Sequence, residues 1–525
     1  MNTALPVTQL AEKQWDLIVI GGGITGAGIA RIAADRGLAT LLVEQQDFAW
    51  GTSSRSSKMV HGGLRYLGSG QYRLTRDAVR ERQRMLEEAP GLVEPLHYIM
   101  PHYQRQFPGP RIFGLLLWLY DKIAGRRNHD FLPGDRVLDW IPGLRRERLK
   151  GGTRFADAGT DDARLVLRLI HEADTDGATI RNYVRATHVR QGAPASVTLE
   201  DRETGETATA RARLVVSATG AWTDALRQHL GADRTIRPLR GSHLVVPFWR
   251  LPVASSVTLM HPEDGRAMFI FPWEGMTVIG TTDLDHEGDL NDEPVVTEPE
   301  YRYMLTLADH YFPDHQVTRD SIVASWSGVR PVVSTNHDVA PSDESREHEI
   351  WDDSGVVSVA GGKLTTFRLI AEEVLATGAP YLADPEVVRG PGPNRVFRPA
   401  PETDRPPGLS SRQWHRLKGY YGPDLPDVLS AGPLTRIATT DTLWAELVWA
   451  AGHEGVRHLD DLLLRRTRIG MLLPEGGRDW LDAIETACAP VMTWSADDWG
   501  REKARYLTIW RQAYYLPRED AESGA

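Results

Sequence analysis

Three glycines near the start of the chain have the spacing of a nucleotide-binding turn. Gly21, Gly23 and Gly26 form a G-x-G-x-x-G pattern between an apolar run at residues 15–20, which predicts a buried strand, and a predicted helix at residues 25–36. In such a turn the first glycine makes the bend, the second lets backbone approach a pyrophosphate, and the third lets the helix pack on the strand. The helix N-terminus adds unpaired N–H groups that favour an anion. The pattern predicts a dinucleotide site; the alternative is a glycine turn with a purely structural role.

An acidic residue completes this unit. Glu44 ends a second apolar run, "ATLLVE" at residues 39–44. A carboxylate at that strand end can accept hydrogen bonds from both hydroxyls of an adenosine ribose, and it would repel a 2′-phosphate. We therefore expect NAD or FAD rather than NADP.

Later segments favour one of these two cofactors. A loop rich in hydroxyl groups, "QQDFAWGTSSRSSKMVHGGLRYL" at residues 45–67, can donate hydrogen bonds to a diphosphate and a ribityl chain; the alternative is a polar surface loop. Two more apolar runs end in glycine turns, "LVVSATGAWTD" at 214–224 and "SVAGGKLTTFRL" at 358–369. Turns so far apart suit a long cofactor that is held at several points, whereas a nicotinamide enzyme normally needs one contiguous unit. The sequence therefore favours FAD.

The composition limits the remaining classes. The chain of 525 residues is 41% hydrophobic, which is typical of a globular enzyme, and its formal net charge of −11 argues against a nucleic-acid-binding protein. A single cysteine, Cys488, excludes an internal disulfide and a cysteine-based metal centre, and we expect no metal. The N-terminus has no secretory signal pattern, and the longest apolar run, at residues 112–120, is too short to span a membrane.

The rest of the chain falls into three parts. Residues 190–330 contain apolar runs typical of antiparallel strands, two of them joined by a turn at "WEG". Residues 385–409 are rich in proline and predict a linker without regular structure. Periodic apolar segments after residue 410 predict a small helical domain.

A series of more specific motifs extends from about residue 14 to residue 515. In chain order they are "GGGITGAGIA", "GTSSRSSKMVHGGLRYL", "DDARLVL", "SATGAW", "RGSHLVVP", "IGTTD", "SGVRPV", "GGKLTTFR" and "LDDLLLRRTRIGML". In this order they resemble the FAD-dependent, respiratory (aerobic-type) glycerol-3-phosphate dehydrogenases, within the larger group that also contains D-amino-acid and sarcosine oxidases.

The resemblance implies an α/β fold. It consists of a discontinuous, Rossmann-like FAD-binding domain of the glutathione-reductase type, an antiparallel β substrate domain and a C-terminal helical domain. The expected limits are 1–75 with 150–235 and 325–384 for the FAD-binding domain, 76–149 and 236–324 for the substrate domain, 385–409 for the proline-rich linker, and 410–525 for the helical domain.

The resemblance also implies a reaction, the oxidation of sn-glycerol 3-phosphate to dihydroxyacetone phosphate with hydride transfer to the flavin. Arginine forks suit the phosphate dianion, although a single arginine is more often a surface or ion-pair residue. An imidazole suits proton removal near neutral pH; we expect His243 in that role and His61 nearer the flavin, with Arg330 stabilising the alkoxide. The substrate-site residues that the motifs imply are Arg65, Tyr66, His243, Arg330, Arg346 and Lys363, with His243, Arg330 and Lys363 taking part in catalysis.

Most of the expected FAD contacts lie at the glycine turns and in the hydroxyl-rich loop. They are Gly21, Gly23, Ile24, Thr25, Gly26, Glu44, Thr52, Ser53, Ser57, Lys58, His61, Gly62, Gly63, Ala186, Ala218, Thr219, Gly220, Gly328, Gly361, Gly362, Lys363, Leu364 and Thr365.

In the family that the chain resembles, electrons leave the flavin for membrane quinone, and the enzyme sits peripherally on the cytoplasmic face of the inner membrane. The segment at 110–127 suits this, because its apolar residues are flanked by cations that meet anionic lipid; the alternative is a core helix between domains. The flanking cations are Arg111, Lys122, Arg126 and Arg127. A homodimer is a further expectation.

Three other functions are compatible with the same motifs. One is a glycerol-3-phosphate oxidase that uses oxygen. Another is an amine or amino-acid oxidase of the same superfamily, which the clustered arginines disfavour. The third is a flavin-binding regulatory or electron-transfer protein without substrate turnover.

Overall fold

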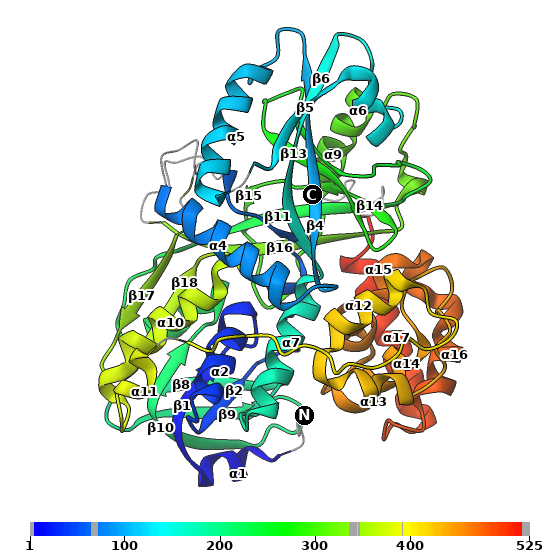
Figure 1. Cartoon of the computed structure of the whole chain (residues 1–525). Helices are drawn as coiled ribbons and strands as arrows, with labels where there is room; N and C mark the ends of the chain where they lie inside the picture. The colour runs from blue at the N-terminus through cyan, green and yellow to red at the C-terminus, as the bar shows by residue number, and fades with distance from the viewer. Residues whose placement is uncertain are drawn as a thin grey trace.

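Two sheets and a group of C-terminal helices make up the computed structural model (Figure 1). It describes residues 5–64, 72–125, 127–334, 344, 347–390 and 392–516. Within these ranges, none of the helices has the length and apolarity that crossing a bilayer requires.

The first sheet carries the predicted nucleotide-binding unit at its centre. Its parallel strands follow the order β18-β10-β1-β2-β7, and Ile18 is in register with Val215 on one side and Leu41 on the other. β17 is antiparallel to β18, and β8 and β9 extend the sheet beyond β10. The strands are β1 (Gln14–Ile20), β2 (Thr40–Val43), β7 (Thr179–Arg181), β8 (Val184–Arg190), β9 (Ala195–Asp201), β10 (Thr207–Ser217), β17 (His348–Asp352) and β18 (Val356–Gly361).

Three helices pack together on one face of this sheet. They are α2 (Ile24–Asp35), α7 (Asp162–Thr175) and α10 (Phe367–Gly378). The predicted helix after the first glycine turn is therefore present, and Gly37, at φ +77°, follows its end as a helix-terminating glycine should. Two shorter helices, α1 (Val7–Glu12) and α8 (Thr223–Gln228), pack against β9–β10 and β18 respectively.

The second sheet is antiparallel except where β12 runs parallel to β4. Its order is β15-β11-β14-β13-β12-β4-β6-β3, with β16 on β11 and β5 on β6. The "WEG" turn joins β13 to β14 as predicted. The strands are β3 (Met59–Val60), β4 (Val93–Tyr103), β5 (His129–Pro133), β6 (Leu149–Thr160), β11 (Ile236–Pro247), β12 (Ser256–Met260), β13 (Ala267–Trp273), β14 (Met276–Gly280), β15 (Leu284–Asp285) and β16 (Ala324–Val333).

Helices also flank the second sheet. α9 packs on β11 and β14, and α6 on β5 and β6, while α4 and α5 pack against each other beside β6. The bounds are α4 (Tyr72–Glu88), α5 (Pro110–Ala124), α6 (Gly134–Trp140) and α9 (Glu298–Tyr311).

The C-terminal region is helical, as predicted, and it packs against the helices on the first sheet and against the second sheet. Leu417 and Trp449 share an apolar core with α2, α7 and α10, whereas Leu463 and Trp499 share one with Trp326 of β16. The helices are α12 (Ser411–Tyr421), α13 (Leu425–Ser430), α14 (Trp444–His453), the π-helix η8 (Asp461–Arg466), α15 (Ile469–Leu472), α16 (Leu481–Cys488) and α17 (Ala496–Ala513).

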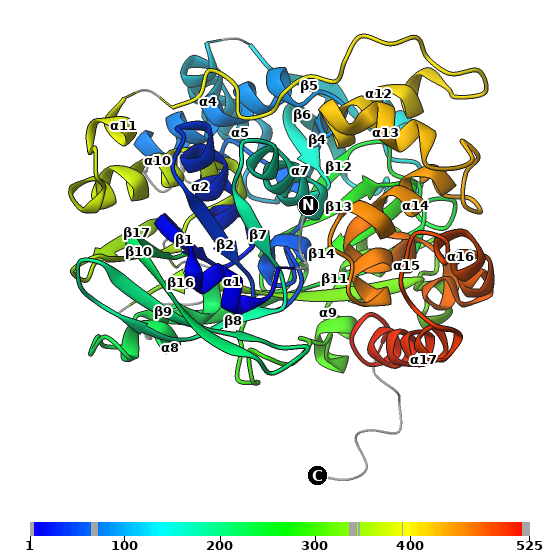
Figure 2. The same ribbon diagram turned by 90° about the horizontal axis from the view of Figure 1, so that it is seen from below.

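A proline-rich segment joins the first sheet's layer to the helical region and runs over the surface (Figure 2). The prediction that residues 385–409 have no regular structure is wrong at their start, where α11 (Glu386–Arg389) forms a short helix. The segment at 392–409 contains no helix or strand, but buried arginines hold its carbonyl groups. Arg31 Nε donates to the Val396 carbonyl at 3.1 Å, and Arg168 Nη2 donates to the Arg398 carbonyl at 3.0 Å.

The predicted domain limits stay a prediction, but two strands bear on them. β6 and β16 lie in stretches expected to belong to the FAD-binding part, yet both hydrogen-bond within the second sheet. The pattern of apolar residues in each of these strands would suit either sheet, so the sequence alone does not show which sheet the strand joins.

Candidate active site

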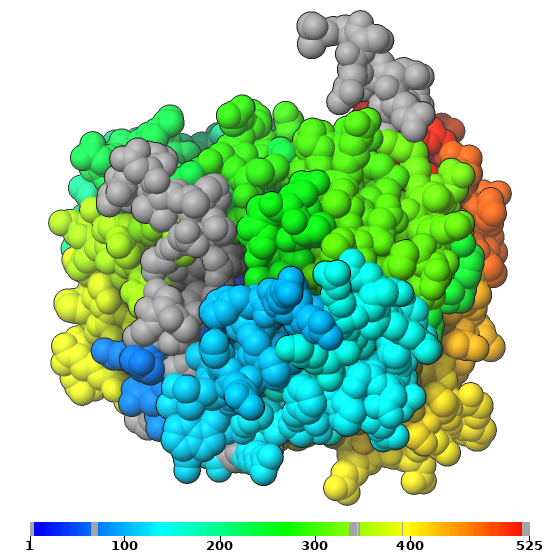
Figure 3. Space-filling model, turned by 90° about the horizontal axis from the view of Figure 1, so that it is seen from above, coloured from blue at the N-terminus to red at the C-terminus, as the bar shows by residue number. Residues whose placement is uncertain are grey.

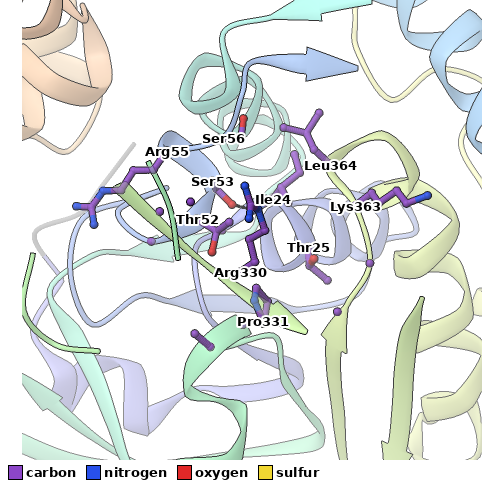
Figure 4. A pocket seen from close by; sticks show the side chains of 18 of the residues that line it. Ile24, Thr25, Thr52, Ser53, Arg55, Ser56, Arg330, Pro331, Lys363 and Leu364 are labelled. Carbon is purple, nitrogen blue, oxygen red and sulfur yellow. Dashed lines mark hydrogen bonds between the residues drawn. The ribbon is translucent and has the colours of Figure 1, made fainter. Parts of the chain in front are cut away.

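A cavity of about 950 Å³ is lined by residues of both sheets. The carboxyl ends of β1, β10 and β18 reach it from the first sheet, and β4, β13 and β16 reach it from the second. The carboxyl ends of parallel strands are where open α/β sheets place their ligands. Figure 4 shows one part of this wall, with side chains from α2, the hydroxyl-rich loop, β16 and the turn after β18.

The first glycine turn forms part of the cavity wall. Gly21 has φ +111°, and a Cβ on Gly26 would lie 1.9 Å from the Gly21 carbonyl oxygen. Gly26 therefore serves close packing and does not line the cavity, whereas Gly21, Gly23, Ile24 and Thr25 do. The N-terminus of α2 has no side-chain cap of its own; the Ile24 N–H donates to Ser53 Oγ at 2.9 Å. An anion bound here would meet the N-terminus of a helix and a backbone that it can approach closely.

Glu44 lies in the cavity wall at the end of β2. Its carboxylate accepts hydrogen bonds from the Gly22 N–H at 2.7 Å and the Gln46 N–H at 2.9 Å. Burial raises the pKa of Glu44, and these two backbone donors oppose that rise. Ala186, from the neighbouring β8, lines the same part of the cavity. The backbone thus fixes the Glu44 carboxylate beside the position where we expect a ribose hydroxyl.

The two later glycine turns reach the same cavity. Ala218, Thr219 and Gly220 line it after β10, and the turn after β18 lines it with Gly361, Gly362, Lys363, Leu364 and Thr365. Gly361 has φ +77°, and a Cβ on it would lie 2.5 Å from the Glu347 carbonyl oxygen. Gly328 of β16 also lines the cavity, and a Cβ there would lie 2.8 Å from the Arg55 carbonyl oxygen.

These features fit FAD. Three backbone turns from segments far apart in the sequence face one cavity, beside the N-terminus of α2 and the half-buried carboxylate of Glu44. The volume of about 950 Å³ is at the upper end of ordinary ligand sites, as a long cofactor and a small substrate require.

The hydroxyl-rich loop supplies another wall, but two of its predicted cofactor residues point elsewhere. Thr52, Ser53, Ser57, His61 and Gly63 line the cavity. Lys58 does not: its buried ammonium donates to both carboxylate oxygens of Asp162, at 2.7 and 3.0 Å. Gly62 does not either, because it packs against Tyr120, whose hydroxyl oxygen would lie 2.0 Å from an added Cβ. The sequence showed a cation and a glycine in the right loop but not the direction each faces.

Arg330 lines the cavity from β16. Its Nη1 donates to Asp283 Oδ1 at 2.7 Å and its Nη2 donates to Thr281 Oγ1 at 3.0 Å. Its side chain is 18% exposed, so it is held in place and still reaches the cavity. A Cβ on Gly241 would lie 2.2 Å from Arg330 Nη2, which means that the neighbouring strand leaves room for the guanidinium only because residue 241 is glycine.

His243 is close to the cavity but behind its wall. The buried ring stacks on Trp326, with ring centroids 4.8 Å apart, and Nε2 lies 2.9 Å from Ser57 Oγ, which does line the cavity. Burial, with smaller contributions from Arg330 and Lys58, holds the pKa of His243 well below 6.5. The imidazole is therefore neutral at pH 7, and Ser57 links it to the cavity.

The remaining predicted substrate residues are divided. Lys363 lines the cavity, and in Figure 4 its side chain extends away from Arg330. Arg65, Tyr66 and Arg346 lie outside the described residues. The structure thus brings Arg330, Lys363 and, through Ser57, His243 to one cavity.

Several cavity residues were not predicted. Thr281 and Asp283 fix Arg330, Arg266 lies 3.5 Å from Asp283, and Trp50 and Trp222 form an aromatic pair with centroids 6.0 Å apart. Thr281, Asp283 and Trp222 belong to the motifs "IGTTD" and "SATGAW", so a signal for them was present. Arg266 and Trp50 carry no comparable signal.

Known proteins resemble the chain over most of its length. The family model described as FAD dependent oxidoreductase matches residues 16–376, and that of the C-terminal domain of alpha-glycerophosphate oxidase matches residues 361–499. A Mycobacterium bovis protein named glycerol-3-phosphate dehydrogenase 2 is 35% identical over 527 residues, covering 95% of this chain and 88% of its own length. An aerobic glycerol-3-phosphate dehydrogenase of Staphylococcus haemolyticus is 35% identical over 384 residues, covering 71% of this chain and 69% of its own. The crystal structure of the Bacillus halodurans glycerol-3-phosphate dehydrogenase complexed with FAD superimposes with a TM-score of 0.74 at 30% identity and covers 96% of each chain.

Proposed function

The chain belongs to the FAD-dependent glycerol-3-phosphate dehydrogenases, and from this premise we propose that it oxidises sn-glycerol 3-phosphate to dihydroxyacetone phosphate and passes the electrons to a membrane quinone. The observation that carries the proposal is the position of Arg330, whose guanidinium faces the same cavity as the three glycine turns. Cofactor contacts and a fixed cation for an anionic substrate thus share one space.

Arg330 is proposed to bind the phosphate or the developing alkoxide of the substrate. Asp283 and Thr281 fix the plane of its guanidinium at the cavity wall, where a planar cation suits a phosphate or alkoxide oxygen. Lys363, which also lines the cavity, is proposed to add a second cation. Arg65, Tyr66 and Arg346 stay proposals on the basis of the motifs alone.

His243 is proposed to take the proton of the C2 hydroxyl, directly or through Ser57. A neutral imidazole can accept a proton, and the burial that lowers its pKa keeps it neutral at pH 7. Bound FAD would supply the hydride acceptor. The residues of this chain therefore hold the substrate, orient it and remove one proton.

The acceptor proposal is supported by α5. Its exposed residues Ile112, Leu115 and Trp118 lie on one helical face, with exposed fractions of 56, 61 and 50%, while Phe113 and Leu117 are buried on the other. A core helix between domains would not leave such a face open. Figure 3 shows the part of the chain that contains α5, in blue and cyan, at the surface of the molecule. An apolar face with flanking cations suits binding in the plane of a membrane.

The reaction is tested by anaerobic addition of glycerol 3-phosphate to the FAD-loaded protein. Rapid loss of the flavin absorbance is expected. Bleaching by an amino acid but not by glycerol 3-phosphate would instead support an amino-acid oxidase, and no bleaching by either would support a binding or electron-transfer protein. Release of hydrogen peroxide in air, at the rate of substrate oxidation, would show that oxygen and not quinone accepts the electrons.

The membrane proposal is tested by sedimentation with vesicles containing anionic lipid. The wild-type protein is expected to bind, and the double variant Leu115→Asn/Trp118→Asn is expected to stay in the supernatant. Val491, another exposed apolar residue (42%) but in the helical region, provides the control variant Val491→Asn. Equal binding by all three proteins would contradict the role of α5.

A further inference from the structure

One segment connects the FAD cavity to the C-terminal helical region. We call residues 45–58 the cofactor loop. Its residues Trp50, Thr52, Ser53, Arg55 and Ser57 line the cavity. Asp47, Ser54 and Lys58 do not line it; they are buried on the opposite side of the loop. The two sides of the loop therefore face different surroundings.

Two arginines of the helical region hold Asp47. Arg466 Nη1 donates to Asp47 Oδ2 at 2.6 Å, and its Nη2 donates to Oδ1 at 2.7 Å, which is a bidentate pair. Arg465 Nε donates to Oδ2 as well. Both arginines come from η8, a π-helix, and all three side chains are buried. Asp47 and Arg466 are separated by 419 positions in the chain.

A third arginine holds the other end of the cofactor loop. Arg468 Nη1 donates to the Ser54 carbonyl at 3.2 Å, and its Nη2 donates to Asp162 Oδ1. Lys58 Nζ donates to the same carbonyl at 2.6 Å and to Asp162. Asp162 also accepts from the Ser56 N–H at 2.9 Å and from the Ser56 hydroxyl at 2.7 Å.

The backbone of the cofactor loop needs such support. Ala49 and Lys58 have φ +60° and +58°, a left-handed conformation that side-chain-bearing residues avoid. Ala49 lies two positions from Asp47, and Lys58 is itself part of the second contact. Arg468 also has φ +60°. Each strained residue thus lies at or beside a buried ionic contact that can hold it there.

Movement of the loop would change the cavity at three places. Ser53 Oγ accepts from the N-terminal Ile24 N–H of α2, and Thr52 Oγ1 donates to the Val329 carbonyl. Ser57 Oγ lies 2.9 Å from His243 Nε2. The FAD side of the cavity and the histidine behind its wall both depend on where the loop sits.

We propose that Arg465, Arg466 and Arg468 are cofactor-positioning residues, which hold the cofactor loop in its FAD-binding conformation from the side opposite to the cavity. This gives the C-terminal helical region a function in FAD retention. The proposal concerns FAD alone and does not depend on the identity of the substrate or the electron acceptor.

The test uses the full-length FAD-loaded protein and the variants Asp47→Asn, Arg466→Lys and Arg468→Lys. FAD release after dilution is followed by flavin fluorescence, and the visible circular dichroism of the bound flavin reports its surroundings. Loss of a charged or bidentate hydrogen bond is expected to weaken FAD binding roughly tenfold or more and to change the dichroism. Arg466→Lys keeps the charge, so it is the variant expected to fold even if Asp47→Asn does not.

Glu446→Gln is the matched control. Glu446 is a fully buried carboxylate of the helical region that pairs with Arg416, and none of its hydrogen bonds reaches the cofactor loop. The Glu446→Gln substitution is expected to lower Tm, while FAD affinity stays within about twofold of the wild type, because the loss of this carboxylate acts on stability alone. Wild-type FAD affinity and dichroism in the folded Arg466→Lys and Arg468→Lys proteins would overturn the proposal. So would an equal loss of FAD affinity in Glu446→Gln.

Discussion

Two parts of the cavity wall differ in the residues that build them: the FAD end, where we propose that the cofactor binds, and the substrate end around Arg330, where we propose that the substrate binds. At the FAD end the wall consists of backbone and small residues, such as Gly21, Gly23 and Gly361, and the space exists because side chains are absent. At the substrate end the wall carries long side chains, of which Arg330 is held by Asp283 and Thr281. The FAD end should therefore be sensitive to added atoms, and the substrate end to removed ones.

The largest effect is expected when the substrate end loses its fixed guanidinium. Arg330→Ala should lower kcat/KM for glycerol 3-phosphate on the order of 10²–10³-fold, because a charged hydrogen-bond donor to the substrate is lost. FAD content should not change, since we propose that Arg330 contacts the substrate and not the cofactor. Steady-state kinetics and the flavin absorbance of the purified protein measure the two quantities.

Arg302→Ala is the control for this variant. Arg302 lies on α9 with its side chain 72% exposed, so kinetics close to wild type are expected. Wild-type kinetics in Arg330→Ala itself would remove Arg330 from the site, and loss of FAD would remove the proposed separation of the two ends.

A smaller effect is expected when one carbon is added at the FAD end. In Gly26→Ala the new Cβ would lie 1.9 Å from the Gly21 carbonyl oxygen, so the first glycine turn must shift. The free energy of unfolding should fall by about 1–3 kcal/mol, as in other overpacked sites, and FAD should bind more weakly. Thermal unfolding and FAD titration measure both effects.

Gly114→Ala provides the matched comparison. Gly114 is also a helical glycine, in α5, but an added Cβ would meet nothing within 4 Å. Alanine there should raise stability by up to about 1 kcal/mol because of its higher helix propensity. Equal destabilisation by the two alanines would show that helical glycine as such, rather than close packing under the turn, is what matters.

The smallest effect concerns pH. Because the pKa of His243 is held well below 6.5 in the folded protein, the unfolded chain binds a proton there at a higher pH than the folded chain does. Stability contributed by the neutral imidazole is present above pH 6.5 and declines as the pH falls below it, by about 1.4 kcal/mol per pH unit until the folded pKa is reached. Thermal unfolding of wild type and His243→Gln at pH 7.5 and 5.5 should show the wild type losing more.

The same shift predicts that kcat/KM stays constant down to pH 6.5 if His243 is the base. An acid limb in kcat/KM centred at or above pH 6.5 would contradict that assignment. His243→Gln, whose side chain does not titrate, separates this limb from titration of the substrate phosphate.

The sequence predicts the FAD end better than the substrate end, and the reason is local. The turn at Gly21, the strand ending at Glu44 and the helix between them follow from short-range spacing, and the structure contains them as predicted. Arg330, Asp283 and Thr281 all lie in motifs, but only the fold shows that Asp283 and Thr281 fix the direction of the Arg330 side chain. The direction of a side chain and its partners on other strands cannot be read from the local spacing of residues in the sequence.

Long-range ionic contacts were the hardest to predict. Lys58 lies in a loop that lines the cavity, and nothing in its neighbourhood indicates that it pairs with Asp162 instead. Asp47 and Arg466 are each ordinary charged residues in the sequence, and only the fold brings them together. The strands β6 and β16 present the same difficulty, because a strand's own pattern does not name its neighbours.

The arginine-held segment at 392–409 has a consequence for the integrity of the chain. Residues 401–405 are exposed. Before this stretch, Arg31 and Arg168 donate hydrogen bonds to the carbonyls of Val396 and Arg398. After it, the helices share a core with α2, α7 and α10. A protease site inserted at 401–405 should therefore yield a nicked protein whose two pieces elute together and keep FAD. In such a protein the peptide bond at the junction is dispensable, and the two parts behave as subunits that happen to be encoded as one.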